Sequence, residues 1–149
     1  MIIRKAELYD LPGAYKLTER FHEQDLEGYT LGHNPESARD AVKVFITEAV
    51  GVVAVQYDDI IGCLGGFITP FLLNSESIVF QEIMWYVRPD KRQTGVGIKM
   101  LSKTMEIVKE LGATHIVMAH TGNNTTKLSQ LYTKMGFEVL ETQYIRGLE

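Results

Sequence analysis

The stretch Trp85 to Leu101, WYVRPDKRQTGVGIKML, joins the end of an apolar run, a loop with two glycines and the start of a helical pattern. The first turn of a helix carries unpaired amides and about half a unit of positive charge, and glycines let an anion approach these amides. Residues 88–99 hold four basic side chains against one acidic side chain, a balance of 4 − 1 = +3: Arg88, Lys91, Arg92 and Lys99 against Asp90. This pattern predicts an anion-binding site at the loop.

Two common nucleotide-binding loops are disfavoured by the residues that follow the glycines. A dinucleotide fingerprint would need a third glycine at position 100, where Met100 stands. A phosphate-loop NTPase would need Gly-Lys-Ser or Gly-Lys-Thr, and neither occurs in the chain. A glycine turn that only allows close packing of a helix on a strand is an equally common interpretation of such a loop.

Hydrophobic periodicity predicts the element order βααβββαβαβ within a single domain, residues 1–149. The expected strands are 2–6, 51–57, 60–69, 78–87, 115–120 and 137–145. The expected helices are 11–21, 35–49, 98–111 and 126–135. Asp10 and Asn34 are the predicted N-caps of the first two helices, and Asp58-Asp59 predicts a hairpin turn between the second and third strands.

The composition is that of a mildly acidic globular protein. Its 149 residues carry 15 basic and 19 acidic side chains, a net charge of −4, and 45% of them are hydrophobic. Cys63 is the only cysteine, which excludes an internal disulfide, and no histidine stands at metal-ligand spacing with another ligand. Without an apolar leader or an 18-residue apolar run, we expect a cytoplasmic protein that binds neither membrane nor nucleic acid.

Two motifs in this sequence resemble those of a known family. The pattern V-x-P-x-x-R-x-x-G-x-G over residues 87–97 resembles the acyl-CoA signature of the GNAT superfamily of N-acyltransferases. The run LYTKMGF at 131–137 is similar to the Leu-Tyr-x-x-x-Gly-Phe helix end of the same family. The resemblance is strong over residues 78–137 and loose over the first two helices, where the family binds its acceptor.

The resemblance implies an α/β fold with a mixed sheet. Such a sheet is largely antiparallel and twisted, has six to seven strands with a splayed central parallel pair, and is flanked by four helices. The strand that ends at Val87 would separate from the strand at 115–120, and the pantetheine arm of acetyl-CoA would pair there like an added strand. The implied activity is direct transfer of an acetyl group from the cosubstrate acetyl-CoA to a primary amine in a ternary complex.

The resemblance also implies which residues contact the cofactor. Amides of the glycine loop would bind its pyrophosphate with the charge of Arg92, and an amide at Met84 or Trp85 would stabilise the oxyanion. The expected cofactor-binding residues are Trp85, Tyr86, Val87, Arg92, Gln93, Thr94, Gly95, Val96, Gly97, Ile98 and Asn124. The family often has Asn and Ala where this chain has Thr125 and Leu128, and Asn124 would replace the lost hydrogen bond or cap the helix.

Glu82 and Tyr132 are the expected catalytic pair. Glu82 is the only acid in the strand 78–87, and a carboxylate there is either a general base, direct or through water, or a side chain at a wet or paired position. Burial would raise its pKa, which suits a base. Tyr132, from the second motif, would protonate the departing thiolate; otherwise it is a tyrosine at the rim of the core.

The acceptor side is acidic, because residues 19–40 hold six acids against two arginines, a balance of 2 − 6 = −4. Such a segment would attract a cationic amine, or it is an ordinary solvated helix face. Candidate lining residues are His22, Tyr29, His33 and His120. The alternatives to an enzyme are an inactive acyl-CoA-binding module with a regulatory or scaffold role, and a different nucleotide-binding domain. Pairing into a homodimer through exposed strands is a further expectation from the resemblance.

Overall fold

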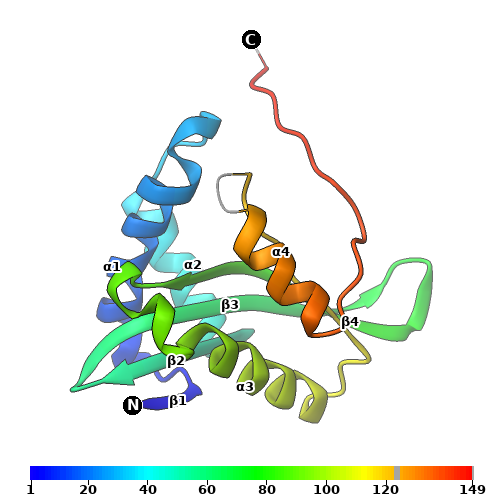
Figure 1. Cartoon of the computed structure of the whole chain (residues 1–149), viewed down its shortest axis with the longest axis horizontal. Helices are drawn as coiled ribbons and strands as arrows, with labels where there is room; N and C mark the ends of the chain where they lie inside the picture. Colours follow the sequence, from blue (N-terminus) through cyan, green and yellow to red (C-terminus); the bar gives the residue numbers. More distant parts are fainter. Residues whose placement is uncertain (123–124, 149) are drawn as a thin grey trace.

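The computed structural model describes residues 1–122 and 125–148, and these residues form one five-stranded sheet in the order β1-β2-β3-β4-β5 (Figure 1). The strands are β1 (Ile2–Lys5), β2 (Val50–Gln56), β3 (Asp59–Phe71), β4 (Asn74–Val87) and β5 (His115–Val117). Neighbours are antiparallel except β4 and β5, which are parallel. The mixed, largely antiparallel sheet confirms the predicted fold class, with five strands in place of six or seven.

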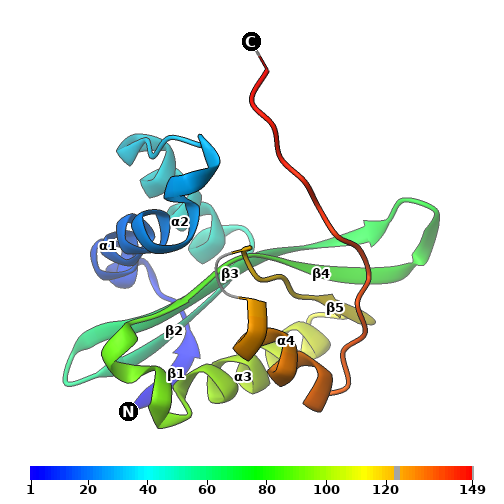
Figure 2. The same ribbon diagram turned by 45° about the horizontal axis from the view of Figure 1, so that its top comes forward.

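Four α-helices cover the two faces of this sheet in the described residues: α1 (Leu11–Phe21), α2 (Pro35–Thr47), α3 (Val96–Glu110) and α4 (Thr125–Lys134). Helices α1 and α2 lie on one face, and α3 and α4 lie on the other (Figure 2). Short helical turns join them: η1 (Leu8–Asp10), η2 (His22–Leu26), η3 (Glu27–Tyr29) and η4 (Pro89–Thr94). Alternate residues of the strands therefore face two separate hydrophobic layers.

Both predicted N-cap positions are confirmed, but only one of the two side chains makes a capping hydrogen bond. The Asn34 side chain accepts a hydrogen bond from the Ser37 amide at 2.9 Å and so caps α2. Asp10 is the N-cap residue of α1, but its side chain makes no hydrogen bond to the first turn, because the carboxylate is used one turn earlier. It accepts from the Glu7 amide at 2.7 Å and pairs with both terminal nitrogens of Arg4 at 2.8 and 3.0 Å.

The hairpin between β2 and β3 is confirmed, although its turn lies one residue earlier than predicted. Gln56 pairs with Asp59, so the two turn residues are Tyr57 and Asp58. Both have positive φ, 50° and 64°, as the tightest hairpin turns require. Asp59 already belongs to β3.

A bulge bends β4 in its middle. Gly65 pairs with Met84 and Gly66 pairs with Glu82, which leaves Ile83 without a partner on β3. A Cβ atom on Gly66 would overlap the Gln81 carbonyl oxygen, so only glycine permits this close approach of the two strands.

Strands β4 and β5 separate directly after three residue pairs. Val79, Phe80 and Gln81 pair with His115, Ile116 and Val117. Beyond this point β4 continues to Val87 but pairs only with β3 in the described part of the chain. The expected splayed parallel pair is therefore present, and β5 is three residues long where the sequence predicted 115–120.

The predicted terminal strand, 137–145, is wrong for this single chain. After Gly136, with φ +87°, residues 137–148 extend away from the sheet without secondary structure, and Gly147 near their end lies close to Thr30 (Figure 1). Aromatic and branched side chains give this segment a strand-like pattern. A strand also needs a neighbour that accepts its backbone hydrogen bonds, and the described residues of the same chain do not supply one.

Candidate functional site

The end of β4 leads into α3 through η4 and Gly95. Gly95 has φ +79°, a left-handed conformation that glycine adopts without strain, and it is the N-cap of α3. A Cβ atom added at Gly95 would have no neighbouring atom within 4 Å, and no side chain caps α3. The first helical hydrogen bond runs from the Lys99 amide to the Gly95 carbonyl at 3.2 Å. The amides of the first three residues, Val96 to Ile98, are thus left without a partner in the helix.

The glycine loop differs from the prediction in its local structure. Pro89 to Thr94 form a 3-10 helix, and α3 begins at Val96, two residues earlier than expected. Gln93 and Thr94 therefore lie in the preceding turn, and only the amides from Val96 to Ile98 belong to the first turn of α3. Two glycines in a sequence are compatible both with an open loop and with the 3-10 helix that residues 89–94 form here.

Arg92 is held against the end of β4. Its Nε donates to the Val87 carbonyl at 2.7 Å, and its Nη2 donates to Gln24 Oε1 at 3.3 Å. The guanidinium also lies over the Tyr86 ring, 5.1 Å from the centroid. In this structure Arg92 therefore fastens η2 to the strand end, a role that local sequence did not predict because Gln24 and Arg92 are 68 residues apart.

Next to this contact lies Asp25, a buried carboxylate that the sequence treated only as part of an acidic segment. Burial raises the pKa of Asp25, and the nearby positive charge of Arg92 partly offsets that rise. No local pattern around residue 25 distinguishes it from its exposed acidic neighbours, since its burial depends on the packing of η2.

Glu82 and Tyr132 come together at one backbone residue, Ala119, just beyond β5. The Ala119 amide donates a hydrogen bond to the Glu82 carboxylate, and the Ala119 carbonyl accepts from the Tyr132 hydroxyl at 2.7 Å. Both side chains are only 8% exposed. The structure thus places the two predicted catalytic residues, 50 positions apart in the chain, on the two backbone groups of one residue, Ala119, close to where β4 and β5 diverge.

Burial sets the protonation of this pair. It raises the pKa of Glu82 to about 8, although the Ala119 amide acts in the opposite direction. Burial is also the larger cause of a raised pKa for Tyr132, and the negative charge of Glu82 adds to it. The effect of the Glu82 charge on the Tyr132 pKa agrees with the contact that both side chains make with Ala119.

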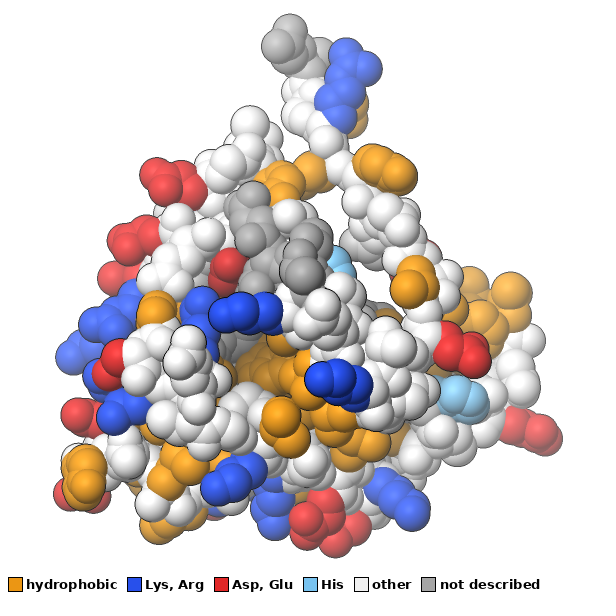
Figure 3. Space-filling view, in the orientation of Figure 1, with side chains coloured by type: hydrophobic (Ala, Val, Ile, Leu, Met, Phe, Trp, Pro, Cys, Tyr) orange, Lys and Arg blue, Asp and Glu red, His pale blue; other side chains and the backbone are white. Residues whose placement is uncertain are grey.

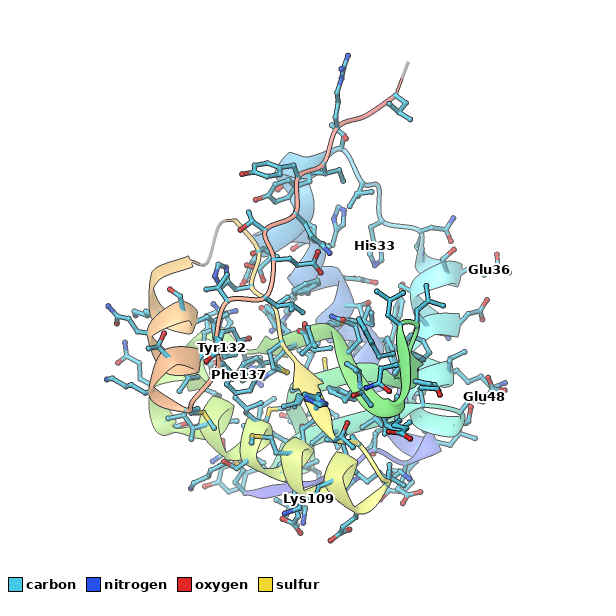
Figure 4. All side chains as sticks on the ribbon, turned by 90° about the vertical axis from the view of Figure 1, so that its right-hand side faces the viewer. His33, Glu36, Glu48, Lys109, Tyr132 and Phe137 are labelled. Atoms are coloured by element: carbon cyan, nitrogen blue, oxygen red, sulfur yellow. The ribbon has the colours of Figure 1, made fainter. Side chains whose placement is uncertain are left out.

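A row of aromatic rings connects this pair to the start of α3. The Tyr132 ring lies 6.3 Å from the Trp85 ring and 5.3 Å from the Phe137 ring, between centroids (Figure 4). A Cβ atom on Gly97 would stand 3.4 Å from Trp85 Cζ2, so the first turn of α3 packs on the indole. Figure 3 shows a hollow with a hydrophobic floor between the start of α3 and α4, with basic side chains at its rim.

The candidate acceptor residues are partly assembled near the η2–η3 turns. A His22 ring nitrogen bonds to the Leu31 carbonyl, and the rings of His22 and His33 lie 5.5 Å apart. The Tyr29 hydroxyl lies against Gly122, next to the chain beyond β5. His120 is exposed and bonds to the adjacent Thr121 carbonyl. The five other acids of segment 19–40 are exposed: Glu19, Glu23, Glu27, Glu36 and Asp40.

Further sequence predictions concern Asn124, the single cysteine, metal ligands and membrane-spanning helices. Asn124 lies outside the described residues. Cys63 is buried in the core, where burial raises its pKa to about 12. In the described part of the chain, no group of three or more potential metal ligands is assembled, and none of the helices has the length and apolar character to cross a bilayer.

Comparison with known proteins identifies the family. The family model described as "Acetyltransferase (GNAT) family" matches residues 11–137. The chain belongs to the GNAT acetyltransferase family. Among curated proteins, no relative of this sequence was found.

Solved structures of GNAT proteins share the fold at low sequence identity. A probable acetyltransferase is 21% identical, with a TM-score of 0.78 over 100% of this chain and 99% of its own. AAC(6')-Iy, in complex with the bisubstrate analogue CoA-S-monomethyl-acetylneamine, is 17% identical, with a TM-score of 0.77 over 99% and 97%. Ribosomal-protein-alanine N-acetyltransferase from Brucella melitensis biovar Abortus 2308 is 13% identical, with a TM-score of 0.74 over 99% and 100%.

The buried Glu82 predicts a specific dependence of stability on pH. Its folded-state pKa of about 8 lies above the ordinary value for Glu, so folding takes up a proton between roughly pH 4.3 and pH 8. The free energy of unfolding should therefore fall as pH rises through this window, by at most about 1.4 kcal/mol per pH unit from this group. Urea unfolding of Glu82→Gln should lack this component. The exposed Glu110→Gln variant is the control and should keep the wild-type slope; equal slopes for wild type and Glu82→Gln would contradict the assignment.

Proposed function

We propose that this protein is an acetyl-CoA-dependent N-acetyltransferase that moves an acetyl group to a primary amine by direct attack in a ternary complex. The observation that carries the proposal is the shared contact of Glu82 and Tyr132 with Ala119, beside the free edge of β4. A residue that can accept a proton and one that can donate a proton stand together in a buried place. A module that only binds acyl-CoA has no need of this pair.

The residues present fit coenzyme A at two places. The unpaired amides from Val96 to Ile98, at the positive end of α3, suit its pyrophosphate. The free edge of β4 beyond Gln81 suits the amide groups of pantetheine, which would pair with it as an added strand. When bound, acetyl-CoA supplies the activated acetyl group. Because Arg92 is fastened to the Val87 carbonyl, its contribution is to fix the strand end and to add positive charge nearby.

The catalytic steps follow from the pair at Ala119. Glu82, with its raised pKa, accepts a proton from the ammonium group of the acceptor, directly or through water, and leaves a neutral amine. The amine nitrogen attacks the thioester carbonyl carbon, and an amide at the bulge, Met84 or Trp85, stabilises the oxyanion. The carbon–sulfur bond then breaks, and Tyr132 protonates the departing thiolate. The acetylated nitrogen gives up its extra proton to the tyrosinate oxygen of Tyr132, which leaves the neutral amide product and the neutral tyrosine. Burial keeps Tyr132 protonated and ready to donate.

We propose a cationic amine as the acceptor. Five exposed acids surround the link between α1 and α2, and their field would attract a positively charged molecule. The bisubstrate analogue bound by AAC(6')-Iy carries an acetylneamine part, while the Brucella relative is named for a ribosomal protein. Small cationic amines and protein amines are both possible substrate classes in this fold, and the acidic segment favours the cationic small molecule.

Coenzyme binding tests the role of the α3 N-terminus. Ile98→Asp places a carboxylate at a half-exposed position in the first turn, where an acid favours the helix but repels a pyrophosphate. We expect unchanged or slightly higher thermal stability without ligand, and at least about tenfold weaker CoA binding by calorimetry. Ile98→Asn, of equal size without charge, should lose much less affinity. Wild-type affinity in Ile98→Asp would place the pyrophosphate elsewhere.

The rate of amine-dependent CoA release tests the proposed catalytic roles of Glu82 and Tyr132. Glu82→Gln and Tyr132→Phe should each lower amine-dependent CoA release by about a hundredfold or more, because general acid–base groups contribute that much. Both variants should still gain thermal stability from acetyl-CoA, and Glu110→Gln should keep full activity. CoA-dependent stabilisation of the wild type without turnover on any amine would favour the inactive binding module. Stabilisation by ATP but not by CoA would favour another nucleotide-binding protein.

The dependence of activity on ionic strength tests whether the acceptor is cationic. For a polyamine or aminoglycoside, kcat/KM should fall as ionic strength rises, since screening weakens steering. The double variant Glu23→Gln/Glu27→Gln should have a shallower salt dependence and a higher KM for the amine, with the KM for acetyl-CoA unchanged. Glu106→Gln/Glu110→Gln, with the same charge change on α3, is the control. Equal salt dependence in all three proteins would exclude steering by this segment.

A further inference from the structure

The indole of Trp85 carries a hydrogen-bond donor that the rest of the protein does not use. Trp85 lies on β4, where it pairs with Leu64 of β3. Its ring packs against the core cluster that contains Val96 and Met100 of α3. The Nε1 atom is buried, and it has no hydrogen-bond partner among the described residues. An indole nitrogen can only donate, and a buried donor without an acceptor lowers stability. Such a group requires an explanation, and a role toward a ligand is one.

The edge of the ring that carries Nε1 lies beside the first turn of α3. Cζ2, which is two bonds from Nε1 in an indole, would be 3.4 Å from a Cβ atom on Gly97. Gly97 stands between Val96 and Ile98, and the amides of these three residues have no partner in the helix. The ring also lies 6.3 Å from the Tyr132 ring, between centroids. The indole thus stands between the helix start and one member of the proposed catalytic pair.

The backbone groups nearest to the indole N–H are donors as well. The three amides from Val96 to Ile98 point out of the N-terminus of α3, which carries about half a unit of positive charge. The carbonyl groups of the same turn point along the helix and accept from its next turn. The indole N–H adds a further partial positive charge beside these amides. An anion satisfies all of these donors together, because its oxygens accept several hydrogen bonds at once.

We propose that the side chain of Trp85 belongs to the coenzyme site, and that its indole N–H donates to an oxygen of the pyrophosphate that the α3 amides bind. This inference rests on the proposed function, in which acetyl-CoA supplies the pyrophosphate. The resemblance to the family assigns only the main chain of Trp85 to the coenzyme, at the pantetheine arm. The side-chain contact makes the site selective for the phosphorylated coenzyme, because a ligand without phosphate leaves the buried donor unpaired.

Replacement of a single atom tests this contact, because Trp85 is the only tryptophan in the chain. Expression in a tryptophan-requiring host that is supplied with benzothienylalanine replaces the indole N–H by sulfur and keeps the shape of the ring. We expect this protein to bind CoA at least about tenfold more weakly in calorimetry, since a hydrogen bond to a charged group is lost. Without ligand, its unfolding temperature should be unchanged or higher, because a buried unpaired donor has been removed. The control is 5-fluorotryptophan, which keeps the N–H and should keep the affinity for CoA.

Pantetheine, which has no pyrophosphate, shows which part of the coenzyme the N–H contacts. The shift in unfolding temperature that pantetheine causes should be the same with tryptophan and with benzothienylalanine at position 85. Equal CoA affinity of the two proteins would mean that the indole only packs under α3. An equal loss for CoA and pantetheine would place the N–H at the pantetheine arm. A lower unfolding temperature of the sulfur-containing protein without ligand would mean that the N–H has an acceptor within the chain.

Each of these last three results would overturn the role of the Trp85 side chain and leave the acetyltransferase proposal intact. A protein with its natural tryptophan that binds no CoA would instead overturn both proposals. The two failures are therefore distinguished by the calorimetric titration of the unsubstituted protein.

Discussion

The separation of β4 from β5 is the constraint on which the site depends. Parallel pairing holds the two strands together only from Val79 to Gln81, and the bulge at Ile83 then bends β4 away. A strand whose backbone groups are unpaired on one side must bind water or a ligand there, since buried unpaired amides are costly. In the proposed function, the free edge of β4 and the amides at the start of α3 bind two parts of the same long cofactor.

The divergence also brings the chain after β5 into contact with the proposed catalytic pair. Ala119 contributes no side-chain chemistry, yet its amide and carbonyl orient Glu82 and Tyr132. Burial of this unit raises the pKa of Glu82 toward neutrality and keeps Tyr132 protonated. Burying a carboxylate is unfavourable, but at this position the same burial raises the pKa of Glu82, as a general base requires.

Local sequence predicted elements well where periodicity and capping act over a few residues. The four helices, the β2–β3 hairpin and the cap at Asn34 follow from such short-range rules. Short-range rules were insufficient where a partner outside the local pattern decides. The Asp10 carboxylate pairs with Arg4 and not with the first turn of α1, the contact of Arg92 with Gln24 was not foreseen, and the segment 137–145 lacks a neighbouring strand. The residue types at these positions do not by themselves show which partner each side chain contacts or whether a strand forms.

The sequence by itself determined the order of the elements, the glycine-containing turn before α3, and the presence of one acid in a strand and one tyrosine in a helix. It could do so because backbone conformation and amphipathic spacing depend on near neighbours. Only the tertiary structure decided that Glu82 and Tyr132 meet at Ala119, that Asp25 is buried, and that residues 137–148 have no place in their own sheet. These outcomes depend on contacts between segments that are far apart in the chain, and such contacts form only when the strands separate and the helices pack.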